Sequence, residues 1–125
     1  QKIISLQEEW GKITGKEARI PQAGIVVNRS LIQSNPEIVK ILQEQLKDNI
    51  QKINDNPEKA AQTIVKYQDG LEEDFIVNLL PDLNLTFVDA QKAKEELEFF
   101  YTELAKLSPD IIGGKLPDEG FYYHE

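Results

Sequence analysis

The sequence predicts a mainly α-helical chain of four or five helices with one or two short strands. Two observations predict the helices: apolar residues recur every three or four positions along most of the chain, and two Asn-Pro pairs mark helix starts. A third observation predicts a strand, because residues 24–28 are rich in β-branched side chains. We treat residues 1–125 as one helical segment, since a hydrophobic content of 40% suits a single core.

The first predicted helix lies near the start of the chain. Its apolar face consists of Ile3, Leu6, Trp10 and Ile13, which repeat at helical spacing. Gly15 follows and offers the left-handed residue that commonly ends a helix. Because Trp10 falls on the apolar face, we interpret it as a packing residue, with stacking on a ligand as the alternative.

A connector and a short strand follow this helix. Pro21 favours extended backbone at Ile20, and the run Gly24–Asn28 indicates a strand buried on both faces. It is the one strand that the pattern predicts clearly. Because unpaired backbone groups are unfavourable, we expect its partners to lie outside this chain or in a second copy of it.

Asn-Pro pairs begin the next two predicted helices. The Asn side chain can accept a hydrogen bond from an unpaired N–H at the helix start, and Pro at the first helical position lacks an N–H that would be unpaired. Asn35–Pro36 begins a helix that runs to about Asn54, and Asn56–Pro57 begins a helix that Gly70 closes.

The last third of the chain contains two further predicted helices. Leu71–Leu80 forms a short helix that Pro81 stops, and Asp89 begins a long helix that ends at Ser108. Between them, the alternation of residues 83–87 indicates a strand, with an ordered loop as an equal alternative.

The tail of the chain combines a Gly113–Gly114 hinge with an aromatic cluster at Phe121–Tyr123. Three exposed rings would be an aggregation liability. We therefore expect the tail to dock on another part of the protein.

Composition excludes several classes of function. The formal net charge is −8 and basic residues do not cluster, so we expect no nucleic-acid partner. There is no cysteine, and His124 is the only histidine, which excludes thiolate zinc sites, iron–sulfur clusters and Cys–His nucleophiles. No catalytic motif occurs. We predict that the chain is not an enzyme and holds no metal and no cofactor.

One connector is the best candidate for contact with a small molecule. Residues 19–24 join a helix to the predicted buried strand, and they combine backbone fixed by Pro21, backbone opened by Gly24 and polar side chains. A plain connector between two elements is the alternative.

Three stretches resemble the carboxy-terminal region of the substrate-binding proteins of ABC importers. They run from Ile20 to Ile32, from Asn35 to Leu42 and from Asn56 to Ala61. The closest group is the nitrate/sulfonate/taurine and thiamine-precursor type. The segments Leu80–Val88 and Ile111–Tyr123 are similar to the closing segment of one subgroup.

The resemblance implies that the chain is the C-terminal part of a two-lobe α/β periplasmic-binding-protein fold. It implies a small-molecule ligand in the full-length protein, an ABC permease as partner, and a location in the periplasm or on the extracellular face of the membrane, with a signal or lipoprotein segment upstream. Pro21, Gln22 and Ala23 match a position that borders the ligand cleft and are the expected ligand-binding residues. The alternative is a free-standing helical interaction domain or a homodimer that pairs through the exposed strand.

Overall fold

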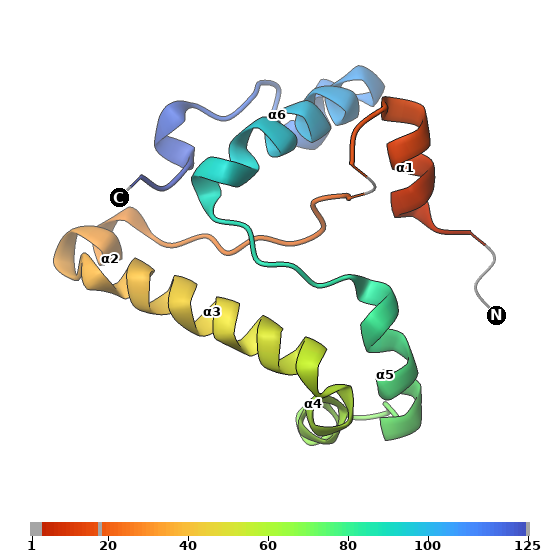
Figure 1. Cartoon of the computed structure of the whole chain (residues 1–125). Helices are drawn as coiled ribbons and strands as arrows, with labels where there is room; N and C mark the ends of the chain where they lie inside the picture. Colours follow the sequence, from red (N-terminus) through yellow and green to blue (C-terminus); the bar gives the residue numbers. More distant parts are fainter. Residues whose placement is uncertain (1–3, 18, 125) are drawn as a thin grey trace. The chain divides into compact units, whose positions relative to one another are not determined.

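The computed structural model describes residues 4–17 and 19–124, and within these residues it forms helices and no strand (Figure 1). This confirms the prediction of a mainly helical chain. The elements are α1 (Leu6–Thr14), α2 (Arg29–Ser34), α3 (Glu37–Asp55), α4 (Pro57–Ile64), α5 (Glu73–Leu79), the 3₁₀ helix η1 (Leu80–Leu83), α6 (Ala90–Leu107), and the 3₁₀ helices η2 (Pro109–Ile112) and η3 (Glu119–Phe121).

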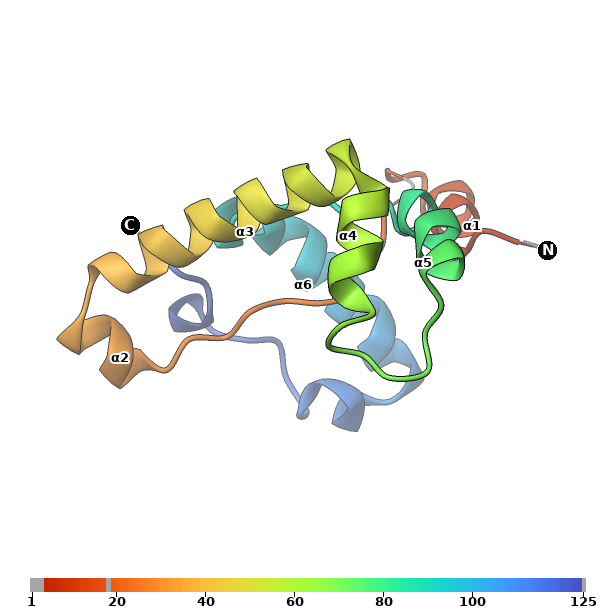
Figure 2. The same ribbon diagram turned by 90° about the horizontal axis from the view of Figure 1, so that it is seen from below.

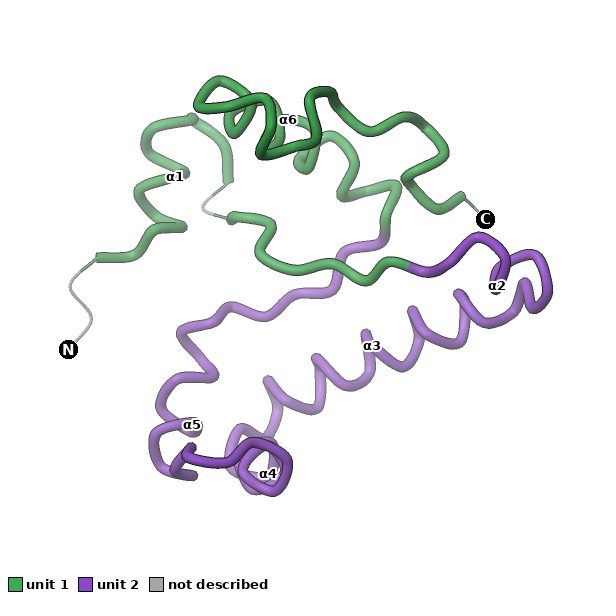
Figure 3. The backbone as a smooth tube through the Cα atoms, turned by 180° about the vertical axis from the view of Figure 1, so that it is seen from behind, with its two compact units in different colours: residues 1–26, 90–125 green, residues 27–89 purple. Residues whose placement is uncertain are grey.

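The chain divides into two units (Figure 3). Unit 1 consists of residues 1–26 and 90–125, and unit 2 consists of residues 27–89. The polypeptide therefore leaves unit 1 once and returns to it once. Unit 1 holds α1, α6, η2 and η3, whereas unit 2 holds the other helices.

In unit 1, α1 begins and ends as the sequence predicts. The Ser5 side chain accepts a hydrogen bond from the N–H of Glu8 at 3.4 Å. Gly15 adopts a left-handed φ of 67° and donates its N–H to the carbonyl of Gly11, so the predicted C-terminal glycine is confirmed. Ile3, which the prediction places on the apolar face, lies outside the described residues.

Trp10 connects α1 to α6. Its ring lies 5.9 Å from that of Phe99 and 5.6 Å from that of Phe100, in both cases edge to face. Such pairs contribute about 0.5–1.5 kcal/mol each beyond the burial of their area. Its contacts support the interpretation of Trp10 as a packing residue.

In unit 2, the core lies where α4 packs on α5, as Figure 2 shows from below. Ala61 of α4 is completely buried, and its small side chain lets α5 approach closely. Ile76 and Leu80 complete the buried cluster, with Ile53 of α3 packed at its edge. This cluster is small, and it fixes the end of α3 beside η1.

The two Asn-Pro pairs behave differently. Asn56 is the N-cap of α4, and its side chain accepts the N–H of Lys59 at 2.9 Å, which confirms the prediction. At α3 the N-cap is Pro36 and no side chain caps the helix, so the predicted capping role of Asn35 is wrong. Asn35 instead ends α2, where its N–H donates to the carbonyl of Leu31.

Helix α2 is a short element that the sequence did not predict. Asn28 is its N-cap, and the Asn28 side chain accepts hydrogen bonds from the N–H and the hydroxyl of Ser30 at 2.9 and 2.7 Å. The predicted strand Gly24–Asn28 ends at this residue, and the strand prediction concealed the capping signal.

Helix α4 is shorter than predicted. It ends at Ile64, and the chain turns before it reaches Gly70, so Gly70 does not close the helix. The β-branched run from Thr63 to Val65 has low helix propensity. Its backbone then tightens, because the N–H of Lys66 donates to the carbonyl of Thr63 instead of continuing the α-helical pattern.

The strand predicted at Gly24–Asn28 does not form, which corrects that prediction. Ile25 and Val26 are also 61% and 83% exposed, so the segment is not buried on both faces within this chain. A strand requires hydrogen bonds to a neighbour. No backbone hydrogen bond joins residues 20–27 to the rest of the described chain.

Leu83 ends η1 and residues 84–87 form a loop, so the alternative of a second strand is wrong for this chain. The side chain of Asn54 donates a hydrogen bond to the carbonyl of Leu85 at 3.0 Å and holds the loop on the end of α3. Asn84 adopts a positive φ of 50°, a backbone conformation that breaks the alternation of a strand. Pro81 lies inside η1, immediately after α5 ends.

Asn56→Ala is expected to lower the free energy of unfolding of unit 2 by about 1 kcal/mol, because the variant leaves the N–H of Lys59 without its cap. Urea denaturation followed by circular dichroism measures the change. Asn35→Ala is the matched control, since Asn35 also precedes a proline but caps nothing with its side chain, and it should change stability by less than about 0.5 kcal/mol. Equal losses in both variants would contradict the capping assignment.

Candidate functional site

The expected ligand-binding residues lie in the extended segment between α1 and α2. Pro21 is half-buried, whereas Gln22 and Ala23 are exposed. No hydrogen bond within the described chain ties Gln22 to another element. The chain thus presents these three residues side by side without enclosing them, and their role as ligand contacts stays a prediction.

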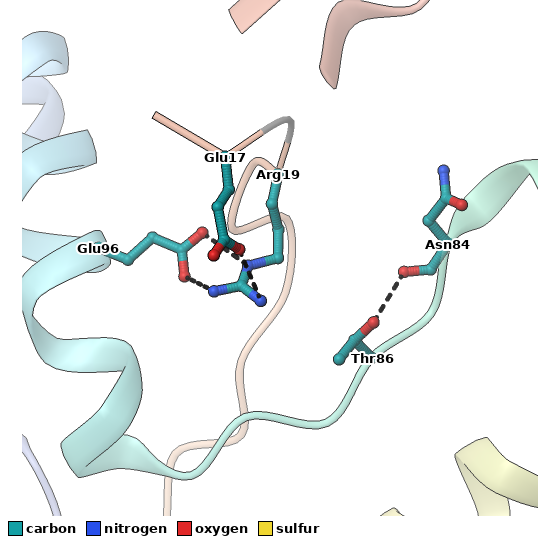
Figure 4. A network of polar contacts seen from close by, with 5 residues as sticks. All are labelled: Glu17, Arg19, Asn84, Thr86 and Glu96. Atoms are coloured by element: carbon teal, nitrogen blue, oxygen red, sulfur yellow. Dashed lines mark hydrogen bonds and ion pairs between the residues drawn. The ribbon is translucent and has the colours of Figure 1, made fainter. Parts of the chain in front are cut away.

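Arg19 anchors the start of this segment to α6 (Figure 4). Its Nε and Nη2 atoms donate to the two carboxylate oxygens of Glu96 at 3.0 and 2.9 Å, and Nη1 lies 3.4 Å from the carboxylate of Glu17. The hydrogen bonds that Arg19 donates to Glu96 raise the pKa of Arg19. Two carboxylates thus surround one guanidinium group, so Arg19 is not a free cation that would attract an anionic ligand.

The tail docks on α6 within unit 1, as the sequence predicts. Lys94 forms an ion pair with Glu119 and lies over the ring of Tyr122, 5.6 Å from its centroid. Gln91 donates a hydrogen bond to the carbonyl of Tyr123 at 2.9 Å. The predicted Gly113–Gly114 hinge is a turn with positive φ at both glycines, held by backbone bonds to η2.

The hydroxyl group of Tyr122 has no hydrogen-bond partner. Tyr122 is only 3% exposed, and its hydroxyl is buried. Burial raises the pKa of this hydroxyl, and the nearby carboxylate of Glu98 adds to the effect. A buried hydroxyl without a hydrogen-bond partner is unfavourable, so Tyr122 stabilises unit 1 through the packing of its ring and not through its hydroxyl group.

A pocket lies in unit 2, away from the residues that the sequence analysis selected. It is a half-open depression with a volume of about 360 Å³. Its lining contains no charged side chain and offers two amides, a hydroxyl and aliphatic groups; the lining residues are Ile53, Asn54, Pro57, Leu80, Pro81, Asn84, Leu85 and Thr86.

Hydrogen bonds within the loop fix the polar side of this pocket. The Thr86 hydroxyl donates to the carbonyl of Asn84 at 3.3 Å (Figure 4), and the Asn84 amide donates to the carbonyl of Asp82 at 3.3 Å. Asn84 and Thr86 were not predicted to line a site, because the alternation of residues 83–87 indicates a strand. The signal that would have found them is the Asn between two leucines, since Asn tolerates the left-handed conformation that the loop needs.

The described residues contain no group of three or more acidic, histidine or cysteine side chains arranged to hold a metal ion. In the same part of the chain, no helix is long and apolar enough to cross a membrane.

Tyr122→Phe is expected to raise the free energy of unfolding by about 1 kcal/mol, because the variant removes a buried hydroxyl that has no partner and keeps the ring. Thermal and urea denaturation measure the change. Tyr67→Phe serves as the control, since Tyr67 is exposed and its hydroxyl faces water. A loss of stability in Tyr122→Phe would mean that the hydroxyl is hydrogen-bonded in solution.

Docking of the tail is expected to depend on pH at both extremes. Lys94 lowers the pKa of Glu119 below its ordinary 4.5, mainly by hydrogen bonding, so the pair stabilises docking above that pH and is lost as the pH falls through the lowered pKa. Glu119 raises the pKa of Lys94 above its ordinary 10.5, so the pair is fully present below that pH and is lost as the pH rises through the raised pKa.

The proton signals of the Tyr122 ring, followed by NMR from about pH 2 to pH 8, measure the acid transition of this docking. His124 also lowers the pKa of Glu119, and Glu98 also raises the pKa of Lys94, so both groups face the ion pair. In Glu119→Gln the acid transition should be absent. An unchanged transition in that variant would assign it to another carboxylate.

No protein-family model, curated protein or solved structure matches this chain.

Proposed function

We propose that this chain is part of the non-enzymatic solute-binding component of an ABC importer, in the C-terminal half of a two-lobe receptor. The observation that carries the proposal is the segment Ile20–Val27, whose backbone has no hydrogen-bond partner in the described chain and whose Ile25 and Val26 side chains are exposed. In a receptor of this type, the segment would lie as a strand in a sheet whose other strands belong to the rest of the polypeptide. The resemblance of Ile20–Ile32 to those receptors supports the same placement.

The extent of exposed surface supports a missing partner. The chain exposes 9767 Å². Two separate globules, each with half of the 14.3 kDa mass, would together expose about 8,200 Å² by the usual scaling of surface with mass. Even when the two units are treated as separate globules, the chain exposes more surface than is expected for its mass. Further polypeptide would cover this additional surface.

In this proposal Pro21, Gln22 and Ala23 border the ligand. They precede the apolar part of the segment directly, so pairing of that part in a sheet would fix their backbone. The ligand would be a small molecule such as a sulfonate, nitrate, a pyrimidine or an aromatic carboxylate. The receptor would act at the periplasmic or extracellular face of the membrane and deliver the ligand to a permease by closing its two lobes.

Hydrogen exchange tests the pairing of the segment. The amides of residues 24–27 should exchange at the rate of unstructured peptide in this 125-residue chain, because none of them donates to the backbone. In the product of the complete reading frame they should exchange at least about a thousandfold more slowly, as core strands do. Equally fast exchange in both proteins would end the proposal.

Ligand binding tests the function itself. A compound that binds only the folded receptor raises its melting temperature by mass action, and saturation at about 100 times Kd adds about 2.7 kcal/mol. A thermal-shift screen of the complete product with the four ligand classes should identify a stabilising compound. If the amides are protected but no compound raises the melting temperature, the proposed fold stands and the four ligand classes are rejected.

The homodimer alternative has a separate test. The described chain contains no strand for pairing between copies, but Ile25 and Val26 are exposed enough to contact a second copy. Size exclusion with light scattering distinguishes a monomer of 14.3 kDa from a dimer of twice that mass. A dimer that Val26→Lys converts to a monomer would favour the alternative.

A further inference from the structure

The connection between α4 and α5 contains the only Asp-Gly pair of the sequence, Asp69–Gly70. Both residues lie in a turn outside the helices, and both are exposed. Gly70 has a positive φ of 82°, and no atom beyond the neighbouring residues lies within 4 Å of the position that a Cβ would take. Gly70 has no side chain to shield its backbone nitrogen, and no other part of the described chain takes that place.

Neither reactive group of this pair is engaged elsewhere. Within the described residues, the N–H of Gly70 donates no hydrogen bond, and the carboxylate of Asp69 makes neither a hydrogen bond nor an ion pair. By contrast, the N–H that follows Asp55 donates to the carbonyl of Lys52 at 3.1 Å. A hydrogen bond of that kind fixes the direction of the N–H and holds the nitrogen away from the preceding side chain.

We propose that Asp69 is a site of spontaneous isomerisation to isoaspartate, which the open turn leaves unprotected. The backbone nitrogen of Gly70 attacks Cγ of the Asp69 carboxyl group, so that an N–Cγ bond forms and the Cγ–OH bond breaks. The hydroxyl group and the amide proton leave as one molecule of water, and a succinimide ring remains.

Hydrolysis of the ring completes the reaction. Addition of water at Cγ breaks the new bond and restores aspartate. Addition of water at the backbone carbonyl carbon of Asp69 breaks the original peptide bond and leaves Gly70 attached through the side chain, which gives isoaspartate. One molecule of water has left and one has entered, so the product has the mass of the starting chain and nothing is oxidised or reduced.

The fold of unit 2 accepts this product. Isoaspartate adds one methylene group to the backbone between α4 and α5 and keeps one negative charge. The buried cluster consists of Ala61, Ile76 and Leu80, none of which lies in this connection. A slightly longer connection costs little in chain entropy. The modified chain therefore keeps its helices, and the isoaspartyl form accumulates in folded protein.

Incubation of the 125-residue chain at neutral pH in water labelled with heavy oxygen tests the proposal. Each passage through the succinimide introduces one labelled oxygen atom. Trypsin, used afterwards in ordinary water, releases residues 67–92 as one peptide, in which three further aspartates serve as internal controls. Mass spectrometry should find at least about tenfold more label at Asp69 than at the other three, whose following residues carry side chains. Chromatography should resolve a second peptide of identical mass.

Two variants separate the effect of the turn from that of the Asp-Gly pair. Asp69→Glu keeps the charge but moves the carboxyl group one methylene further from the nitrogen of Gly70, so the label and the second peptide should be absent. Asn49→Gly creates another exposed Asp-Gly pair at Asp48, inside α3, where each N–H donates to the carbonyl four residues earlier. In folded Asn49→Gly, Asp48 should react at least about tenfold more slowly than Asp69, whereas in urea the two rates should be similar. Circular dichroism verifies that both variants keep their helices.

Three results would overturn the proposal. The first is that Asp69 gains no more label than the other aspartates of its peptide. The second is that Asp69 reacts more than about tenfold more slowly in the folded chain than in urea, since the turn would then protect the pair. The third is an equal rate at Asp48 and Asp69 in folded Asn49→Gly, because the turn would then have no part in selecting the site.

Discussion

Hydrogen bonding of the backbone is the constraint on which the architecture of this chain depends. A helix satisfies its N–H and C=O groups within its own residues, and the side chains of Ser5, Asn28 and Asn56 complete three of the helix starts. The segment Ile20–Val27 has no such local solution, because extended backbone pairs only with a neighbour. The helices therefore form in this chain alone, whereas this segment stays open.

The same constraint explains which elements the sequence could predict. The limits of α3 and α6 follow from apolar spacing over more than four turns, which is a local pattern. The end of α4 does not follow from apolar spacing. At Val65 the chain can form a further turn of α-helix or a tighter turn, and the choice depends on a small difference in helix propensity. The two Asn-Pro pairs carry the same local signal, yet only Asn56 caps a helix. Asn35 differs because α2 ends at that residue, and α2 was not predicted.

The candidate sites divide in the same way. Trp10 was identified as a packing residue from its place on one helix, and its partners on α6 lie about ninety residues away in sequence. The pocket in unit 2 joins the end of α3, the start of α4 and the loop after η1, so no single stretch of sequence contains its pattern. Pro21, Gln22 and Ala23 were selected for their place between a helix and a strand. Because the strand does not form in this chain, a binding role for these residues requires further polypeptide that pairs with Ile20–Val27.

What each exposed apolar feature leaves unsatisfied determines the partner that it can accept. At Ile20–Val27 both the backbone and the side chains are open, so a partner must supply hydrogen bonds in register and must itself be extended. At α5 the backbone is satisfied inside the helix, and only side chains such as Phe75 and Leu79 are exposed, so a contact there need supply only apolar surface. The first requirement is met during folding, because strands that pair in a sheet stay paired in the folded protein. The second makes no demand on the backbone, because the helix already satisfies its own N–H and C=O groups. The two features therefore call for different kinds of contact.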